Sequence, residues 1–144
     1  MKRVFAFWDS SALVPACIHE NNSRQARAYL GQFVPVVWWG TLVEVSGTIC
    51  RAAREHRIGA DEKKGAFERL HELRGGWREI LPENELRELA AQLLEAHPLR
   101  AADSFQAAAA LTWCRQRPAG RQFVSSDQRL LACASSLGFE VIEV

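Results

Sequence analysis

The sequence predicts an α/β fold in which a mainly parallel central sheet lies between layers of helices. Short apolar runs, typical of strands, alternate with longer segments of helical periodicity along the whole chain. The runs are apolar throughout rather than alternating with polar residues, as expected for strands buried on both faces of a parallel sheet. With 144 residues, 48% hydrophobic and 24% charged, residues 1–144 have the size and composition of one globular domain.

The first half of the chain supplies two of the predicted strands. The apolar run that opens residues 4–11 is the first strand, and it ends abruptly at Asp9. A short helix or turn is expected to follow it. Ser23 is then expected to cap a second helix, which Pro35 ends. A second buried strand is predicted over residues 36–39.

The second half continues the alternation of helix and strand. Thr41 begins a helix, and Asp61 is expected to cap the charged helix after it. Four consecutive alanines at residues 107–110 indicate a helix that packs closely against the sheet. The remaining predicted elements are an edge strand at residues 80–82, an amphipathic helix from Glu83, a strand at residues 122–124, a helix ending at Gly138 and a last strand at residues 139–144.

Composition and charge narrow the possible functions. The first apolar run is too short for a signal peptide, and no stretch reaches the roughly 18 apolar residues of a membrane span. We therefore expect a cytoplasmic protein with no membrane partner. The four cysteines lie far apart without zinc-binding spacing, which indicates reduced and mostly buried thiols. Eighteen Arg and Lys balance 17 Asp and Glu to a net charge of +1, and only three of the 18 are Lys. An acidic pit in an arginine-rich body would suit a metal site beside a phosphate-bearing polymer.

Four acidic residues occupy related places in this alternation. Asp9 and Asp127 directly follow predicted strands, and Glu44 and Asp103 lie in the first turns of predicted helices. The carboxyl ends of parallel strands meet at the edge of the sheet where α/β proteins bind ligands, so we expect these acids to converge. A like-charged pair at 4 Å costs about 4 kcal/mol near a protein surface, which calls for a compensating cation. Oxygen ligands without His or Cys select Mg²⁺ or Mn²⁺.

Local helix capping is an alternative explanation for each acid. Asp is a common N-cap residue, and the helix dipole favours Asp103 in a first turn. Thr41 and Glu44 have the spacing of a capping box, as do Ser125 and Gln128. On local pattern alone, both explanations stay open.

Four segments together resemble the PIN-domain ribonucleases, in particular the stand-alone toxins of type II toxin-antitoxin pairs known as the VapC family. They are F-W-D-S-S-A-L-V at residues 7–14, T-L-V-E-V at 41–45, L-R-A-A-D-S-F-Q-A-A-A-A at 99–110 and F-V-S-S-D-Q-R-L-L-A-C-A at 123–134. They follow the family's order over essentially the whole chain. The resemblance implies a three-layer, Rossmann-like α/β/α fold and metal-dependent cleavage of RNA. It also implies inhibition by a small cognate antitoxin protein and a homodimer.

The resemblance assigns roles to the four acids. Asp9, Glu44, Asp103 and Asp127 match the family's catalytic and metal-binding residues, with Mg²⁺ or Mn²⁺ as cofactor. Glu44 is expected either to bind a metal directly or to orient the attacking water. Gln106 departs from the family, in which His is common three positions after the third acid.

Further residues are predicted to lie around these acids. Ser10 and Ser125 are expected to fix the rotamers of the carboxylates by hydrogen bonds. Arg100 is a candidate contact to an RNA phosphate, with a surface salt bridge as its alternative. Trp39 or Trp77 could stack on a base or contact a partner.

A second function is compatible with the same fold. A PIN-like module could bind RNA or protein without catalysing a reaction. The complete set of four acids favours the enzyme. The sequence does not identify the target RNA, the antitoxin, the oligomeric state or the number of metal ions.

Overall fold

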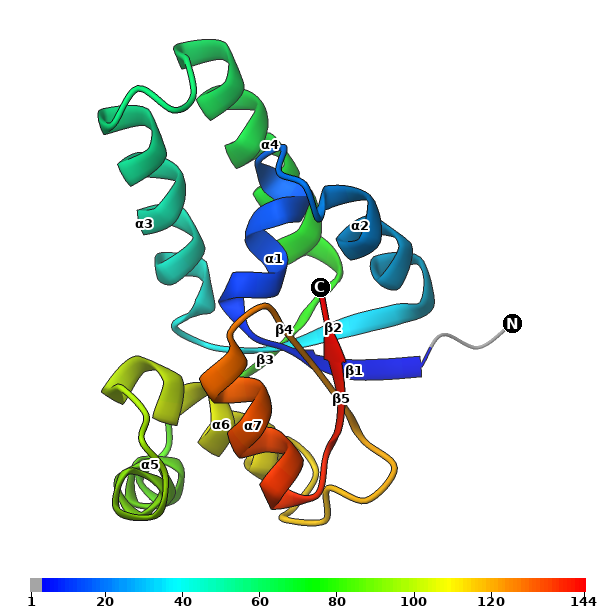
Figure 1. Ribbon diagram of the computed structural model, residues 1–144, viewed down its shortest axis with the longest axis vertical. Helices are drawn as coiled ribbons and strands as arrows, with labels where there is room; N and C mark the ends of the chain where they lie inside the picture. Colours follow the sequence, from blue (N-terminus) through cyan, green and yellow to red (C-terminus); the bar gives the residue numbers. More distant parts are fainter. Residues whose placement is uncertain (1–3) are drawn as a thin grey trace.

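The computed structural model describes residues 4–144, which form five strands and seven helices (Figure 1). All strands are parallel, and they are hydrogen-bonded in the order β3-β2-β1-β4-β5. The predicted α/β fold with a parallel sheet is therefore confirmed. The strands are β1 (Val4–Trp8), β2 (Phe33–Trp38), β3 (Arg78–Ile80), β4 (Gln122–Ser125) and β5 (Glu140–Glu143). The helices are α1 (Ser10–Cys17), α2 (Ser23–Gln32), α3 (Thr41–Arg54), α4 (Ala60–Gly76), α5 (Asn84–Ala96), α6 (Ala101–Trp113) and α7 (Gln128–Leu137).

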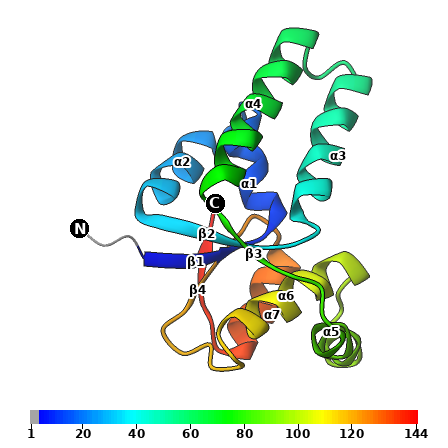
Figure 2. The same cartoon turned by 180° about the vertical axis from the view of Figure 1, so that it is seen from behind.

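Helices cover both faces of the sheet, as Figures 1 and 2 show: α1 to α4 lie on one face and α5 to α7 on the other. Consecutive strand residues point to opposite faces. Trp8 accordingly packs in the core beneath α1 to α4, and Phe7 packs in the core beneath α5 to α7. The four alanines at residues 107–110 are fully buried, so their small side chains allow α6 to lie close to the sheet.

The second strand begins earlier than predicted. Helix α2 ends at Gln32 and β2 begins at Phe33, so Pro35 lies inside the strand. Strand β3 pairs with β2 only from Val36 onward, which leaves one side of β2 open at Pro35, and proline is tolerated at such open edges. The edge strand β3 ends at Ile80, where the predicted strand begins.

Two predicted helix caps are wrong. Ser23 is the first residue of α2, and its hydroxyl accepts a hydrogen bond from the Glu20 N–H at 2.7 Å and donates one to the Ile18 carbonyl at 3.2 Å. Asp61 lies in the first turn of α4 without a capping hydrogen bond. The predicted end of α7 is confirmed, because Gly138 follows it with a left-handed φ of 109°.

The described part of the chain shows no helix long and apolar enough to cross a membrane. All four cysteines are free, and three of them are buried: Cys17, Cys114 and Cys133. Burial raises the pKa of both Cys17 and Cys133 to about 11. The prediction of mostly buried thiols is therefore confirmed for three of the four cysteines.

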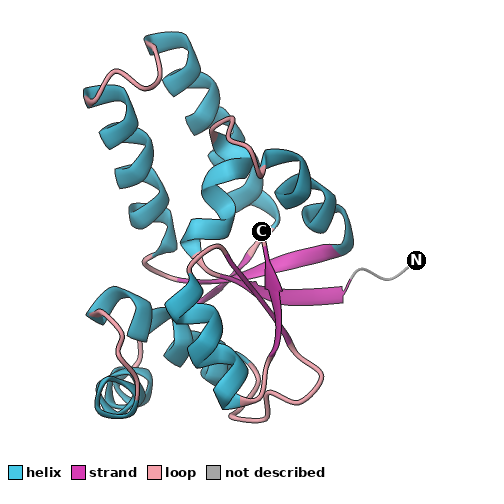
Figure 3. Cartoon of the chain, viewed as in Figure 1, coloured by secondary structure: helices cyan, strands magenta, loops and turns pink. Residues whose placement is uncertain are grey.

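The strand order reverses beside β1, at the centre of the sheet whose strands Figure 3 draws in magenta. The chain places β2 and β3 on one side of β1, and then β4 and β5 on the other. The carboxyl edge at such a reversal is the usual ligand site of open α/β sheets. The residues that follow β1, β2 and β4 therefore face the place where a functional site is expected.

Candidate functional site

Asp9 lies directly at the reversal of strand order. Its backbone N–H donates to the Val124 carbonyl of β4 at 3.0 Å, and its side chain is almost fully buried, at 3% exposure. Asp9 occupies the N-cap position of α1, yet its carboxylate makes no capping hydrogen bond. Capping therefore does not explain why an acidic residue is buried here.

Serine hydroxyls surround the Asp9 carboxylate. Oδ2 of Asp9 accepts hydrogen bonds from Ser125 Oγ at 2.8 Å and from Ser11 Oγ, and Ser10 Oγ lies 3.4 Å from Oδ1. Ser125 Oγ also accepts from the Asp127 N–H at 3.0 Å. One hydroxyl thus links the turn that follows β4 to the acid that follows β1, and Asp9 is held by neutral donors rather than by a cation.

Glu44, in the first turn of α3, is held at both carboxylate oxygens. Ser10 Oγ donates to Oε2 at 2.9 Å, and Gln106 Nε2 donates to Oε1 at 3.0 Å. The same Gln106 nitrogen lies 3.1 Å from Thr41 Oγ1. The capping-box interpretation is wrong, because Gly40 is the N-cap residue of α3 and no side chain caps the helix. The donors to Glu44 come instead from two other helices, Ser10 from α1 and Gln106 from α6.

Asp127 combines a position beside Asp9 with a capping role. It is the N-cap residue of α7, and its Oδ1 accepts from the Arg129 N–H at 2.9 Å and from the Leu130 N–H at 3.1 Å. The alternative capping box between Ser125 and Gln128 is therefore wrong. These two hydrogen bonds fix Oδ1 of Asp127 against the first turn of α7.

Asp103 reaches the same region from α6. It is half-buried and lines a pocket of about 520 Å³ together with Arg100, Ala102, Asp127, Gln128 and Arg129. This pocket is called the charged pocket below. It brings the third and fourth predicted acids together, and it places two arginines beside them.

The four acids act on one another electrostatically. Burial raises the pKa of Asp9, with hydrogen bonds from two serines opposing the rise and the charges of Asp103 and Asp127 adding to it. Burial also raises the pKa of Glu44, and Asp9 and Asp103 contribute to that rise. The pKa of Asp103 rises through burial and the charge of Asp127, while Arg100 and Arg129 oppose the rise. All four carboxylates therefore share one electrostatic environment.

The donor set has the chemistry of a hard-cation site. Carboxylate and hydroxyl oxygens are the ligands that Mg²⁺ and Mn²⁺ prefer. As the side chains stand, however, no three Asp, Glu, His or Cys residues within residues 4–144 are placed to hold one metal ion. The carboxylates of Asp9 and Glu44 instead accept hydrogen bonds from serine and glutamine side chains. Binding an ion would require them to converge further.

Arg100 lies at the N-cap position of α6, exposed at the edge of the charged pocket. Among residues 4–144 the only side-chain ion pair joins Arg57 to Glu55, at 3.0 Å. The salt-bridge alternative for Arg100 is therefore wrong for the described residues.

Three residues of this region were not predicted to take part. Gln106 lies one turn after Asp103, and this spacing of three could have placed both on one helix face. Ser11 donates to Asp9 and accepts from the Ser126 N–H at 2.9 Å. Arg129 follows Asp127 by two positions. No local pattern distinguishes Ser11 or Arg129 from ordinary helix-start residues.

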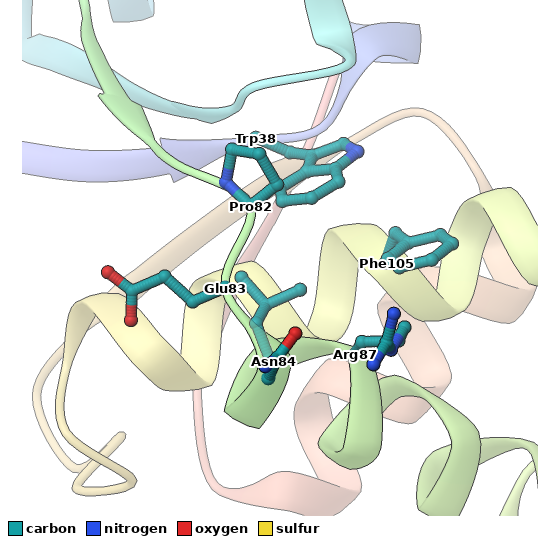
Figure 4. Close-up of a pocket in the computed structure, with 7 residues that line it drawn as sticks. Trp38, Pro82, Glu83, Asn84, Arg87 and Phe105 are labelled. Atoms are coloured by element: carbon teal, nitrogen blue, oxygen red, sulfur yellow. The ribbon is translucent and has the colours of Figure 1, made fainter.

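Of the two tryptophans predicted to stack on a base or contact a partner, only Trp39 is exposed. Trp39 is 53% exposed, but Trp77 is 8% exposed and donates to Glu79 Oε2 at 3.1 Å, so Trp77 is not a free stacking surface. Trp38 stacks on Phe105, with ring centroids 5.3 Å apart. Figure 4 shows these two rings at a second pocket of about 240 Å³, which is also lined by Pro82, Glu83, Asn84, Leu86 and Arg87.

Solved structures with the same arrangement cover nearly the whole chain. PAE2754 from Pyrobaculum aerophilum matches 96% of this chain and 89% of its own, with a TM-score of 0.66 and 19% identity. FitAcB from Neisseria gonorrhoeae matches 96% and 97%, with a TM-score of 0.66 and 16% identity. VapBC-5 from Mycobacterium tuberculosis, a member of the VapBC family of toxin-antitoxin systems, matches 98% and 99%, with a TM-score of 0.61 and 15% identity. The chain has a PIN-domain fold.

The PIN-domain fold confirms the predicted three-layer architecture. A scan of the sequence against protein-family models finds no match, and a search of curated proteins finds none either. At identities of 15 to 19%, the structural matches establish the fold alone.

Proposed function

We propose that the chain is a Mg²⁺- or Mn²⁺-dependent endoribonuclease that acts as the toxin of a toxin-antitoxin pair. One observation carries the proposal: a buried Asp9 that caps no helix shares its electrostatic environment with Glu44, Asp103 and Asp127 at the reversal of strand order. Keeping several carboxylates together destabilises the protein unless a cation joins them. A hard divalent ion is the cofactor that this set of oxygen donors fits.

The roles of the acids follow from their surroundings. Asp9, Asp103 and Asp127 would hold one or two ions, which when bound supply an activated water and neutralise charge on the scissile phosphate. Glu44 would bind an ion or orient the attacking water. Hydrogen bonds from Ser10 at 2.9 Å and from Gln106 at 3.0 Å hold its carboxylate in one orientation, which supports either role. By resemblance, the products would be a 5′-phosphate and a 3′-hydroxyl.

Other residues would bind the substrate or hold the carboxylates. Ser125, with one hydrogen bond to Asp9 and one from the Asp127 N–H, would keep these two acids in register. Arg100, without an ion pair among the described residues, would contact an RNA phosphate. The exposed ring of Trp39 would stack on a base or contact a partner.

The partner proteins are proposed from the structural neighbours. A toxin-antitoxin complex from Klebsiella pneumoniae matches 96% of this chain with a TM-score of 0.62 and 15% identity. We propose that this chain likewise binds a small cognate antitoxin, forms a homodimer and acts on RNA in the cytoplasm. Co-expression with the gene next to its own, followed by copurification, tests the antitoxin.

Metal-dependent cleavage tests the enzyme. The purified protein is incubated with a panel of structured and single-stranded RNAs in Mn²⁺ or in chelator. We expect cleavage in Mn²⁺ only, and its loss in Asp9→Asn. Asp61→Asn is the matched control, because Asp61 lies in a first turn of α4 outside the site. Equal cleavage by Asp9→Asn and the wild type would overturn the assignment of the acids.

A binding module without turnover is the second candidate. The observation that favours it is that no three described acidic side chains are arranged to hold a metal as they stand. RNA binding in chelator and in Mn²⁺ alike, without cleavage of any RNA in the panel, would support this candidate. A crystal soaked in Mn²⁺ separates the two further, because the enzyme requires the side chains of Asp9, Asp103 and Asp127 to converge on an ion.

A further inference from the structure

The charged pocket contains charges of both signs in one cavity. Arg100 and Asp103 enter it from the start of α6, and Asp127 and Arg129 enter it from the start of α7. The two helices lie side by side on one face of the sheet (Figures 1 and 2). At about 520 Å³, the cavity has room for a ligand rather than for a single water molecule.

Neither arginine is neutralised by a carboxylate. Both are exposed, and the only ion pair within residues 4–144 is the distant one between Arg57 and Glu55. Both arginines nevertheless line the same pocket as Asp103 and Asp127. The pocket thus holds two cationic groups close to the acids but not paired with them.

The backbone of Arg129 is anchored to the acidic site. Its N–H donates to Asp127 Oδ1 at 2.9 Å, and this hydrogen bond fixes the position of the Arg129 backbone in the first turn of α7. The backbone of Arg100 likewise occupies the N-cap position of α6. Both side chains therefore extend from ordered backbone at the edge of the pocket.

The mixture of charges narrows the class of ligand. Asp103 and Asp127 weaken the binding of a lone anion, and Arg100 and Arg129 weaken the binding of a lone cation. A phosphodiester strand presents oxygens that a guanidinium binds in bidentate fashion, and it can lie against the arginines while the acids hold a divalent ion. The pocket suits such a strand better than it suits either simple ion.

We infer that Arg129, together with Arg100, holds a backbone phosphate of a nucleic-acid strand in the charged pocket. This inference rests on the proposed function and extends it from the acids to the strand they would cleave. A phosphate contact positions the strand without reading its bases. The effect of losing it should therefore be the same for RNAs of different sequence.

The salt dependence of binding tests this inference without any need for turnover. Dissociation constants of a fluorescently labelled single-stranded RNA are measured in chelator between 50 and 200 mM salt. We expect Arg129→Gln to reduce the slope of log K against log salt by about 0.7, the value for one phosphate contact on a single strand. Arg129→Lys keeps the charge, and should keep the slope while weakening binding through loss of the bidentate geometry.

Arg117→Gln is the matched control. Arg117 is exposed beyond the far end of α6, a helix about 20 Å long that begins beside Arg100. Replacing either arginine by glutamine changes the net charge of the protein by the same amount. It should leave the slope unchanged. An unchanged slope in Arg129→Gln, or an equal reduction in Arg117→Gln, would overturn the inference.

The outcome is independent of whether the protein cleaves RNA. If no RNA is cleaved in Mn²⁺ but Arg129→Gln alone lowers the slope, the phosphate contact stands and the proposed enzyme fails. If RNA is cleaved and the slope does not move, the enzyme stands and the phosphate contact fails. If the wild type shows no salt-dependent RNA binding, the phosphate contact fails, and cleavage in Mn²⁺ alone decides the proposed enzyme.

Discussion

Replacing Gln106 by Leu should separate the function of this side chain from its contribution to stability. Gln106 is fully buried, and its Nε2 donates to Glu44 Oε1 at 3.0 Å and lies 3.1 Å from Thr41 Oγ1. Its Oε1 has no hydrogen-bond partner among the described residues. The amide nitrogen therefore stabilises the folded protein through its hydrogen bonds, and the unpaired amide oxygen destabilises it.

The two contributions are of similar size. Losing the hydrogen bond to the charged Glu44 costs about 1.5–3 kcal/mol, and losing the neutral contact to Thr41 costs about 1 kcal/mol. Removing the unpaired buried oxygen returns about 1–3 kcal/mol, and a buried leucine of similar size adds apolar burial. The free energy of unfolding of Gln106→Leu should therefore stay within about 2 kcal/mol of the wild type. Activity should fall by about 10- to 100-fold, as when a residue that positions a metal-binding side chain is lost.

Two measurements on the same preparation test this. Urea unfolding gives the stability, and RNA cleavage over a series of Mn²⁺ concentrations gives the rate and the metal requirement. Gln122→Leu is the control, because its amide bonds Glu140 Oε2 at the surface, at 3.1 Å. The prediction is refuted if Gln106→Leu cleaves RNA like the wild type. It is also refuted if the substitution lowers the free energy of unfolding by more than about 4 kcal/mol.

Three further predictions concern the site and its support. Burial raises the pKa of Asp9, so its stabilising contribution is present below its unfolded pKa of about 3.9 and is lost as the pH rises through the folded value. Above the folded pKa the ionised side chain opposes folding, and in that pH range Asp9→Asn should stabilise the metal-free protein by about 0.5–2 kcal/mol in thermal unfolding. Gly40→Ala would place a Cβ 2.6 Å from Trp38 Nε1, and urea unfolding should show a loss of about 1–3 kcal/mol. The thiols of Cys17 and Cys133, with pKa values of about 11, should resist a thiol reagent at pH 8 until denaturant unfolds the protein.

The sheet and the place of the acids could be predicted because they depend on patterns that are local and repeated. The buried strands contain short apolar runs. An acid follows β1 directly, and another follows β4 after one intervening residue. The direction of the chain then brings the carboxyl ends of these strands together. Asp9 and Asp127 could therefore be placed at one edge of the sheet without any knowledge of their contacts.

The hydrogen bonds within the site could not be predicted, because local spacing does not show which distant donor competes for a carboxylate. Thr41 and Glu44 have the spacing of a capping box, yet Gln106, 62 residues after Glu44, donates to Glu44 instead. Ser23 has the identity of a cap residue but lies inside its helix. In each case a tertiary or preceding backbone partner satisfies the side chain that the local pattern had assigned to a cap.

The choice of donors around Asp9 has a consequence for cation binding. A guanidinium paired with this carboxylate would neutralise it and compete with any metal ion. Serine hydroxyls instead orient the carboxylate and leave its negative charge in place, while the arginines nearest the acids stay outside ion-pair distance among the described residues. The uncompensated charge destabilises the metal-free protein, and a divalent ion that relieves it would bind more tightly by the same free energy. The arrangement that costs stability in the absence of metal is therefore the one that favours metal binding.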